Sequence, residues 1–175
     1  MTSHQGFQQY IQYSADDNRS IYLLGVSYYN KKQYADVIKT LAMLTDEVNE
    51  YAQSAYLYLG HSYLLTNDKN GAMFAYEKAM ADDSDLQAKE SAMFNYCVLV
   101  EESNIFTFDK KVSVYEKYIN LFPKTSNAET INQLLAASYY TTKNYKAALN
   151  SVKKVNNPSK ELLKAKQIIL YNLGT

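Results

Sequence analysis

The side chains best suited to chemistry in this chain are two histidines and one cysteine. His4 lies near the start of the sequence and His61 stands alone, with no cysteine or second histidine at the spacing that a zinc site needs. Cys97 lies inside the apolar stretch FNYCVLV, which is typical of a buried structural thiol rather than of a nucleophile. These three residues predict neither a metal centre nor a thiol enzyme.

Neighbouring carboxylates can supply acid–base chemistry, and the sequence has several such pairs. All of them fall at expected helix ends, where solvation or helix capping accounts for them. The pairs are Asp16 with Asp17, Asp82 with Asp83, and Glu101 with Glu102. A glycine-rich phosphate loop is missing as well. We therefore expect no catalytic residue, no metal and no cofactor, and predict that the chain is not an enzyme.

Composition places the chain among ordinary globular proteins. Of 175 residues, 47% are hydrophobic and 21% are charged, which is enough for one domain with a real core. Because the formal net charge is zero, no overall field draws nucleic acid or an anionic membrane to the protein. Two prolines and five glycines are few for this length and favour an all-helical chain, whereas tyrosine is abundant, with 18 copies.

Neither a membrane span nor a secretory leader is expected. No run approaches the roughly 18 apolar residues of a spanning helix, and the start MTSHQGFQQY lacks the basic and apolar segments of a signal peptide. A single cysteine cannot form an internal disulfide, so cysteine usage does not report the compartment. Met1 can also stand in front of a segment cut from a longer protein.

An internal repeat organises the chain. An offset of 35 residues places the stretch Ile21–Leu44 on the stretch Tyr56–Ala79 and aligns glycine with glycine. The aligned pairs are Leu24 with Leu59, Gly25 with Gly60, Tyr28 with Tyr63, Val37 with Ala72, Leu41 with Tyr76, and Leu44 with Ala79. Apolar residues at helical spacing on both sides of a polar turn (NKKQ, then TNDKN) predict two helices in each copy.

Two further copies follow. The third keeps the offset from Phe94 to Val98, with Asn95 in the glycine slot, and its second half is then displaced by extra residues to VSVYEKYINLFP. The fourth, over 134–152, has the turn TTKN, Ala136 in the glycine slot and Ala148 in the small-residue slot. The chain therefore contains about four hairpin units.

This pattern resembles the tetratricopeptide repeat, a helical hairpin of about 34 residues with one small residue late in the first helix and another early in the second. The resemblance implies an all-α, right-handed α-solenoid of about four hairpins in a single array over 1–175. The units are approximately 18–52, 53–87, 88–124 and 125–158, with partial hairpins at 4–13 and 159–175. The structural signature residues are Gly25, Val37, Gly60, Ala72, Ala136, Ala148 and Pro123.

The small residues have a physical role in this fold. Two antiparallel helices approach closely only where the side chains at their crossing are small. We predict that Gly25 faces Val37, that Gly60 faces Ala72, and that Ala136 faces Ala148. A glycine inside a helix costs about 1 kcal/mol relative to alanine, and close packing offsets that cost.

The same offset also fits the pentatricopeptide RNA-binding array. An RNA reader needs a basic groove that neutralises phosphates, whereas this chain is neutral overall and has a single arginine, Arg19. The sequence therefore favours the protein-binding relative, and nucleic acid is not expected as a partner.

In tetratricopeptide repeat proteins the first helices line a concave groove that holds a protein or peptide segment. The resemblance implies a partner-binding groove formed by Tyr22, Val26, Tyr29, Leu57, His61, Leu64, Tyr96, Leu99, Gln133 and Tyr140. Packing between neighbouring helices is an equal alternative for its tyrosines. The lysine, asparagine and arginine clamp with which some members bind a C-terminal carboxylate is absent, because Tyr22, Val26 and Tyr58 are among the residues in its positions.

The implied function is a non-enzymatic scaffold for protein–protein interaction. The stretch YEKYINLFPKTSNAETI, over 115–131, also resembles repeats of bacterial envelope proteins such as outer-membrane assembly lipoproteins and the coordinator of the Tol-Pal system. This implies a part of a larger bacterial envelope protein, periplasmic or envelope-associated, with a cytoplasmic location left open. The alternative is a regulatory or sensor segment of a signalling protein with a kinase or DNA-binding effector.

Two further segments carry open expectations. The last stretch, KELLKAKQIILYNLGT, looks like a first helix without its partner, which predicts self-association through exposed terminal helices or a natural capping helix. In the long third unit, Ile105, Phe106 and Phe108 lie near a turn that is polar in the other copies. They either tuck over the hairpin tip or form an exposed patch for a partner.

Overall fold

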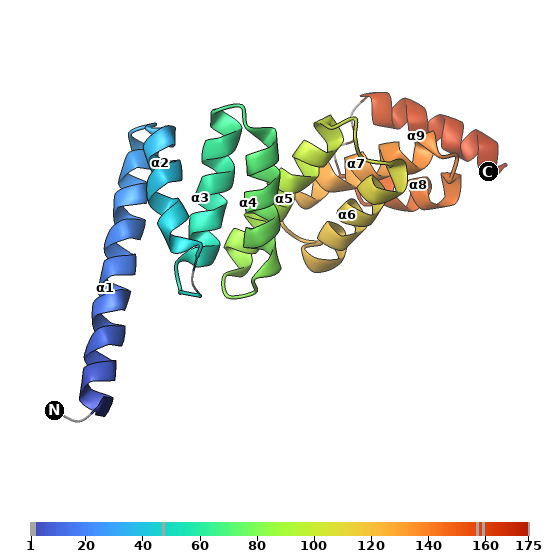
Figure 1. Cartoon of the computed structure of the whole chain (residues 1–175). Coiled ribbons are helices and arrows are strands. Elements are labelled where there is room, and N and C mark those ends of the chain that lie inside the picture. The colour runs from blue at the N-terminus through green and yellow to red at the C-terminus, as the bar shows by residue number, and fades with distance from the viewer. Residues whose placement is uncertain (1–2, 47, 157, 159, 175) are drawn as a thin grey trace. The chain divides into compact units, whose positions relative to one another are not determined.

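The computed structural model describes residues 3–46, 48–156, 158 and 160–174. Within these residues all regular secondary structure is helical, with nine α-helices, one short 3-10 helix and no strand (Figure 1). The elements are α1 (Ser3–Asn30), α2 (Tyr34–Leu41), the 3-10 helix η1 (Ala42–Leu44), α3 (Ala52–Leu65), α4 (Lys69–Ala81), α5 (Leu86–Glu102), α6 (Phe108–Leu121), α7 (Ala128–Thr141), α8 (Tyr145–Val152) and α9 (Lys160–Leu173). The expected all-α class is confirmed.

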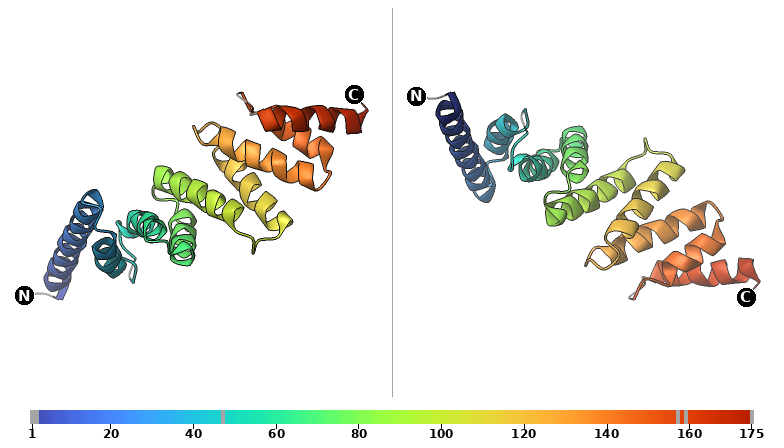
Figure 2. Two further views of the ribbon diagram at one scale, coloured as in Figure 1. Left: turned by 90° about the horizontal axis from the view of Figure 1, so that it is seen from above. Right: turned by 90° about the horizontal axis from the view of Figure 1, so that it is seen from below.

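The chain divides into two compact units, Met1–Met93 and Phe94–Thr175. In the first unit α1 packs on α2, α2 on α3 and α3 on α4; in the second, α6 packs on α7, α7 on α8, and α9 on both α7 and α8. The two further views in Figure 2 show this succession of neighbouring helices inside each unit. Packing of each helix on its neighbours in sequence is the architecture of a helical-repeat solenoid, as the repeat predicts.

Helix α1 differs from the expected partial hairpin at 4–13. It runs unbroken over Ser3–Asn30, and Figure 1 shows its first half extending beyond α2. No proline or glycine interrupts the sequence between Tyr13 and Ile21, so nothing there breaks the helical backbone. The side chains of residues 3–16, with His4 and Asp16 among them, lie outside the described part of the structure.

Three hairpin turns share one backbone conformation. Lys32, Asn67 and Lys143 each have a positive φ, of 60°, 65° and 60° respectively. In the second of these turns the Asp68 amide donates to the Tyr63 carbonyl oxygen at 2.8 Å, and the first and third turns repeat this bond one residue after their left-handed residue. These bonds satisfy carbonyls that the end of a helix leaves without partners, which closes each hairpin within three residues.

The glycine slots are filled differently from the prediction. A Cβ built on Gly25 would lie 2.2 Å from Leu41 Cδ2, and one on Gly60 would lie 2.4 Å from Tyr76 Cε1. The residue against each glycine is therefore one helical turn beyond the expected Val37 or Ala72. The large side chain of Leu41 or Tyr76 on the facing helix fills the space that the glycine leaves. A large residue, rather than a second small one, therefore lies against each glycine.

The fourth hairpin has smaller residues at the corresponding positions. Ala136, Ala148 and Val152 are buried in one apolar cluster, together with Ile169 of α9. Val152 follows Ala136 by the same sixteen residues that separate Gly25 from Leu41. The position sixteen residues after the slot thus holds valine, a smaller residue than the leucine and tyrosine of the first two hairpins.

A buried glutamine fixes the link between α4 and α5. Gln53, with 4% of its surface exposed, places Nε2 within 2.8–3.1 Å of the carbonyl oxygens of Ala79, Asp82 and Asp85. Its Oε1 accepts a hydrogen bond from the Asp85 amide at 2.8 Å. All of these groups belong to the first unit, so one side chain satisfies the backbone of a non-helical connection.

Candidate partner-binding surface

Six of the residues predicted to line a groove lie in the first unit. On α1, Tyr22, Val26 and Tyr29 are spaced by four and three residues and share one face. On α3, Leu57, His61 and Leu64 have the same spacing. All six side chains are half-buried, so each has both a packed part and a part open to solvent.

Ring contacts connect the two helices. The ring centroids of Tyr22 and Tyr51 lie 5.1 Å apart in a stacked arrangement, and Tyr22 also meets Tyr58 edge-on at 6.3 Å. Tyr29 meets Tyr58 edge-on at 5.0 Å, and the His61 ring lies 6.2 Å from Tyr29. We call Tyr22, Tyr29, Tyr51 and Tyr58, together with His61, the tyrosine surface. Offset and edge-on pairs of this kind add about 0.5–1.5 kcal/mol each to the free energy of unfolding.

Two members of the tyrosine surface were missed by the sequence reasoning. Tyr51 and Tyr58 are seven residues apart, or two helical turns, and this spacing is a signal that they share a face. The repeat alignment selected Leu57 instead, because Leu57 stands 35 residues after Tyr22. The repeat alignment therefore selected Leu57, whereas the next residue, Tyr58, makes the ring contacts.

Burial sets the charge of this surface. Burial, together with the neighbouring Tyr58, raises the pKa of Tyr22, and burial also raises the pKa of Tyr29. Burial lowers the pKa of His61, whose ring stands edge-on to Tyr76 with centroids 5.6 Å apart. At neutral pH the phenols of Tyr22 and Tyr29 and the imidazole of His61 are therefore uncharged, and these groups offer hydroxyl and ring edges rather than ions.

The other four predicted groove residues lie in the second unit, and two of them are not accessible. Tyr96 is 2% exposed and Leu99 is 3% exposed, so in this structure neither side chain can meet a partner. Gln133 and Tyr140 are half-buried, and the Tyr140 ring lies 6.3 Å from that of Tyr145. Tyr96 and Leu99 therefore act as core residues here, and we leave them out of the surface considered below.

Cys97 is placed in inert surroundings. Cys97 is fully buried, and burial raises the pKa of its thiol to about 12, so the thiolate that would act as a nucleophile does not form at neutral pH. Among the described residues no group of three or more metal-binding side chains comes together. Within the same residues, no helix has both the length and the apolar character needed to cross a bilayer.

Known proteins resemble this chain at the level of fold. No protein-family model matches the sequence, and no curated protein matches it either. Among solved structures, the chain is similar to a tetratricopeptide repeat protein from Parabacteroides merdae ATCC 43184, with a TM-score of 0.68 and 15% sequence identity. The match covers 91% of this chain and 61% of the other, so the chain spans under two thirds of that protein. The fold is thus that of a tetratricopeptide repeat protein.

Proposed function

We propose that this protein is an interaction scaffold that binds an extended segment of a partner protein on the tyrosine surface of α1 and α3. The observation that carries the proposal is the continuous contact of half-exposed tyrosine rings from two helices. Tyrosine supplies a large contact area with few rotatable bonds, and its hydroxyl tolerates water. Since the rings are already held by one another, little side-chain entropy is lost when a partner binds.

The uncharged side chains of the tyrosine surface favour an uncharged segment of a partner protein. The tyrosine surface contains phenols and a neutral imidazole, so it has no cation with which to grip a carboxylate or a phosphate. A segment rich in apolar and amide groups matches it better than an acidic tail does. This is also why we do not propose the carboxylate clamp of other tetratricopeptide proteins, whose positions here hold Tyr22, Val26 and Tyr58.

The test removes two rings from the surface. A partner captured from the native cells is purified, and its affinity is measured by calorimetry against the full chain and against the double variant Tyr22→Ala and Tyr29→Ala. We expect the variant to bind at least about tenfold more weakly, a loss of about 1.4 kcal/mol. The matched control is Tyr171→Ala, because Tyr171 is 84% exposed and lies on α9, outside the surface. Equal affinity of wild type and a folded double variant would reject the tyrosine surface as the binding site.

A location in a bacterial cell envelope is the finer part of the proposal, and it rests on the sequence resemblance over 115–131. Packing accounts for several residues of that stretch by itself: the Tyr118 hydroxyl and Thr125 Oγ1 lie 2.8 Å apart, and the Tyr118 and Phe122 rings are 5.7 Å apart. Pro123 directly follows the C-cap of α6, where a residue that cannot continue a helix is common. Fractionation of native cells with an antibody against the chain tests the location, and recovery in the cytosol alone would refute it.

A further inference from the structure

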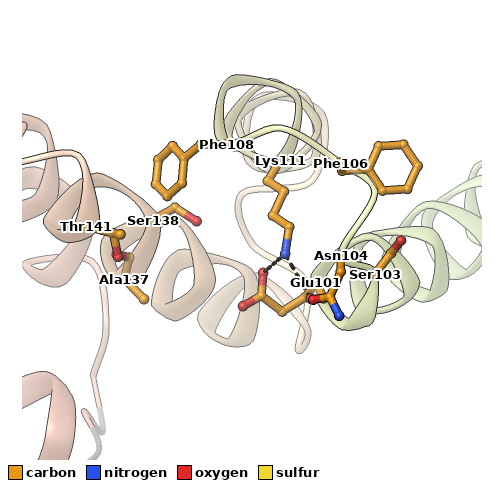
Figure 3. Close-up of a pocket in the computed structure, with 9 residues that line it drawn as sticks. All are labelled: Glu101, Ser103, Asn104, Phe106, Phe108, Lys111, Ala137, Ser138 and Thr141. Atoms are coloured by element: carbon orange, nitrogen blue, oxygen red, sulfur yellow. Dashed lines mark hydrogen bonds and ion pairs between the residues drawn. The ribbon is translucent and has the colours of Figure 1, made fainter.

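Two cavities of the second unit differ in how their charges are arranged. The first lies beside the five-residue loop between α5 and α6, and Figure 3 shows Lys111 and Glu101 at its centre. Lys111 Nζ lies 3.3 Å from Glu101 Oε2, so these opposite charges neutralise each other. Phe106 and Phe108 lie on opposite sides of the pair with their rings directed apart (Figure 3). The charges of this cavity are therefore satisfied within the protein.

The second cavity is bounded by α6, α7 and the end of α8. Its volume is about 210 Å³, below the roughly 300–1,000 Å³ of sites for drug-sized molecules, so it fits only a small ligand. Its lining residues are Glu116, Ile119, Asn120, Leu135, Tyr139, Ala147, Asn150, Ser151 and Lys154. Ile119 and Leu135 are buried, so the cavity reaches the core of the unit.

Acceptor groups line the α6 side of this cavity. Glu116 and Asn120 are four residues apart and share one face of the helix. The Tyr139 hydroxyl of α7 donates to Glu116 Oε1, which holds the carboxylate in place. Burial, together with this bond, raises the pKa of Tyr139, so the phenol keeps its proton and remains a donor. Within the described residues Glu116 Oε2 makes no hydrogen bond, so it is available to a ligand.

Donor groups line the α8 side. Ser151 is 5% exposed, and its hydroxyl makes no hydrogen bond to any described residue. Unlike the hydroxyl of Ser62, which is sealed from solvent, the Ser151 hydroxyl is open to the cavity that it lines. Lys154 lines the same side three residues later. Because buried polar groups in proteins have hydrogen-bond partners, the Ser151 hydroxyl points to an occupant of the cavity.

The cavity thus lies between two unpaired charges of opposite sign. Glu116 and Lys154 are both exposed, and within the described residues neither forms an ion pair. A simple anion is attracted by Lys154 and repelled by Glu116, and for a simple cation the reverse holds. A ligand that carries both charges is attracted on both sides. A free α-amino acid is such a ligand, because at neutral pH it has an ammonium that donates and a carboxylate that accepts.

We propose that this cavity binds a free α-amino acid with a small side chain. The ammonium of the ligand donates to Glu116 and Asn120, and its carboxylate accepts hydrogen bonds from Lys154 and Ser151. None of these residues belongs to the tyrosine surface, so this site and the proposed scaffold function can fail independently.

The experiment is an NMR titration of the full, ¹⁵N-labelled chain with L-serine at about pH 6, where the amine of each ligand is protonated. Ionic strength is held constant. We expect saturable shifts in the amides of 116–120, 135–139 and 147–154, with a dissociation constant of about 1 mM, because exposed charges contribute little each. Two analogues keep one charge each: serinamide retains the ammonium and N-acetylserine the carboxylate. Both should bind at least about tenfold more weakly than serine.

Two variants assign the two sides of the site. Glu116→Gln should weaken serine binding and abolish the preference for serine over N-acetylserine, because the ammonium loses its partner. Lys154→Met should weaken serine binding and abolish the preference for serine over serinamide, because the carboxylate loses its partner. Both positions are exposed, so the variants keep the fold. The matched control is Lys153→Met, since Lys153 is exposed and adjacent in sequence but does not line the cavity.

The outcomes separate the proposal from simple charge effects. It is overturned if serine gives no saturable shifts, if either analogue binds as tightly as serine, or if both folded variants bind serine as the wild type does. An equal loss in Lys153→Met would overturn it as well, because the effect would then come from the overall charge of the unit.

Discussion

Hairpins α3–α4 and α5–α6 show two ways of closing the same supersecondary unit. In the first, Gly60 leaves room for the Tyr76 ring, a three-residue turn joins the helices, and Tyr76 is fully buried. In the second, Asn95 stands in the glycine slot, a five-residue loop joins the helices, and a cavity of about 300 Å³ adjoins the loop. A tight crossing and a short turn thus occur together.

The difference teaches where such a chain can accommodate extra residues. In a hairpin whose helices cross closely, the distance between the two helix ends is set by the crossing. The hydrogen bonds of the three-residue turn form only at that distance. Alanine in the slot, as at Ala136, still allows the three-residue turn, whereas the hairpin with the larger Asn95 in its slot has a tip of five residues. Here the extra residues include Ile105 and Phe106, whereas the shorter tips are polar.

The largest expected effect comes from closing the glycine slot. Gly60→Leu would put a branched side chain where even a Cβ lies 2.4 Å from the Tyr76 ring, so we expect a loss of about 3 kcal/mol or more in the free energy of unfolding. Asn95→Leu is the matched change in the other hairpin, and we expect a loss below about 1 kcal/mol because that slot already holds a side chain. Urea denaturation measures both. Similar losses would mean that the two slots do not differ.

Removing tyrosine hydroxyls gives a smaller contrast of opposite sign. The Tyr115 hydroxyl donates to Glu101, so Tyr115→Phe should lower the free energy of unfolding by about 1–2 kcal/mol. The Tyr76 hydroxyl is buried without a hydrogen-bond partner among the described residues, so Tyr76→Phe should be neutral or raise it by up to about 1 kcal/mol. Thermal melts of the two variants test the contrast, and a loss in Tyr76→Phe would reveal a partner such as an ordered water.

Glycine at the left-handed turn positions should stabilise the short turns only. Lys32 has a φ of 60°, a conformation that costs a side chain but not glycine. We expect Lys32→Gly to raise the free energy of unfolding by about 0.5–1 kcal/mol, after the extra entropy of glycine in the unfolded chain is deducted. Asn104→Gly in the longer loop should give no gain, since no residue described there has a positive φ. A gain at Asn104 equal to that at Lys32 would contradict the distinction between the two kinds of tip.

Acid should weaken the first unit along a gradual slope that begins near pH 6.5. Burial lowers the pKa of His61 in the folded chain. Below pH 6.5, the ordinary pKa of histidine, the unfolded chain therefore binds a proton at His61 that the folded chain does not bind. The free energy of unfolding therefore falls as the pH drops below 6.5, and His61→Gln flattens this slope. Hydrogen bonds from Ser84 lower the pKa of Asp82, whose contribution is lost only as the pH falls below 3.8. Hydrogen exchange of each unit between these two values is the measurement, and a flatter slope in His4→Gln instead would show that the assignment to His61 is wrong.

Periodic features of the fold were predictable from the sequence. The offset of 35 residues identified the helical hairpins and the glycine slots, because each unit repeats the same local problem of packing two helices. The residue against each glycine was placed one turn too early, at Val37 instead of Leu41. Equivalent positions in the repeat indicate which residues lie near a helix crossing. Which large side chain of the second helix fills the space beside the glycine depends on how far the two helices are shifted along their axes. The sequence pattern does not report that axial shift.

Accessibility was less predictable than the fold. Val26, His61 and Tyr96 occupy equivalent slots 35 residues apart, yet the first two are half-buried and Tyr96 is buried. Burial depends on what the neighbouring helices place over a slot, which differs from unit to unit. Gln53 was missed for a similar reason, since its partners at 79, 82 and 85 are distant in sequence and are backbone groups, which leave no residue signature.

The bonds made by Gln53 have a mechanical consequence. A connection between hairpins is ordinarily the softest part of a helical array, where the chain gives way first under tension. Here one amide group ties the connection at Asp82 and Asp85 to the end of α4 and to its own helix α3. Pulling on this region would therefore have to extract a buried side chain before the connection could lengthen, so this link behaves as a stiff joint rather than as a hinge.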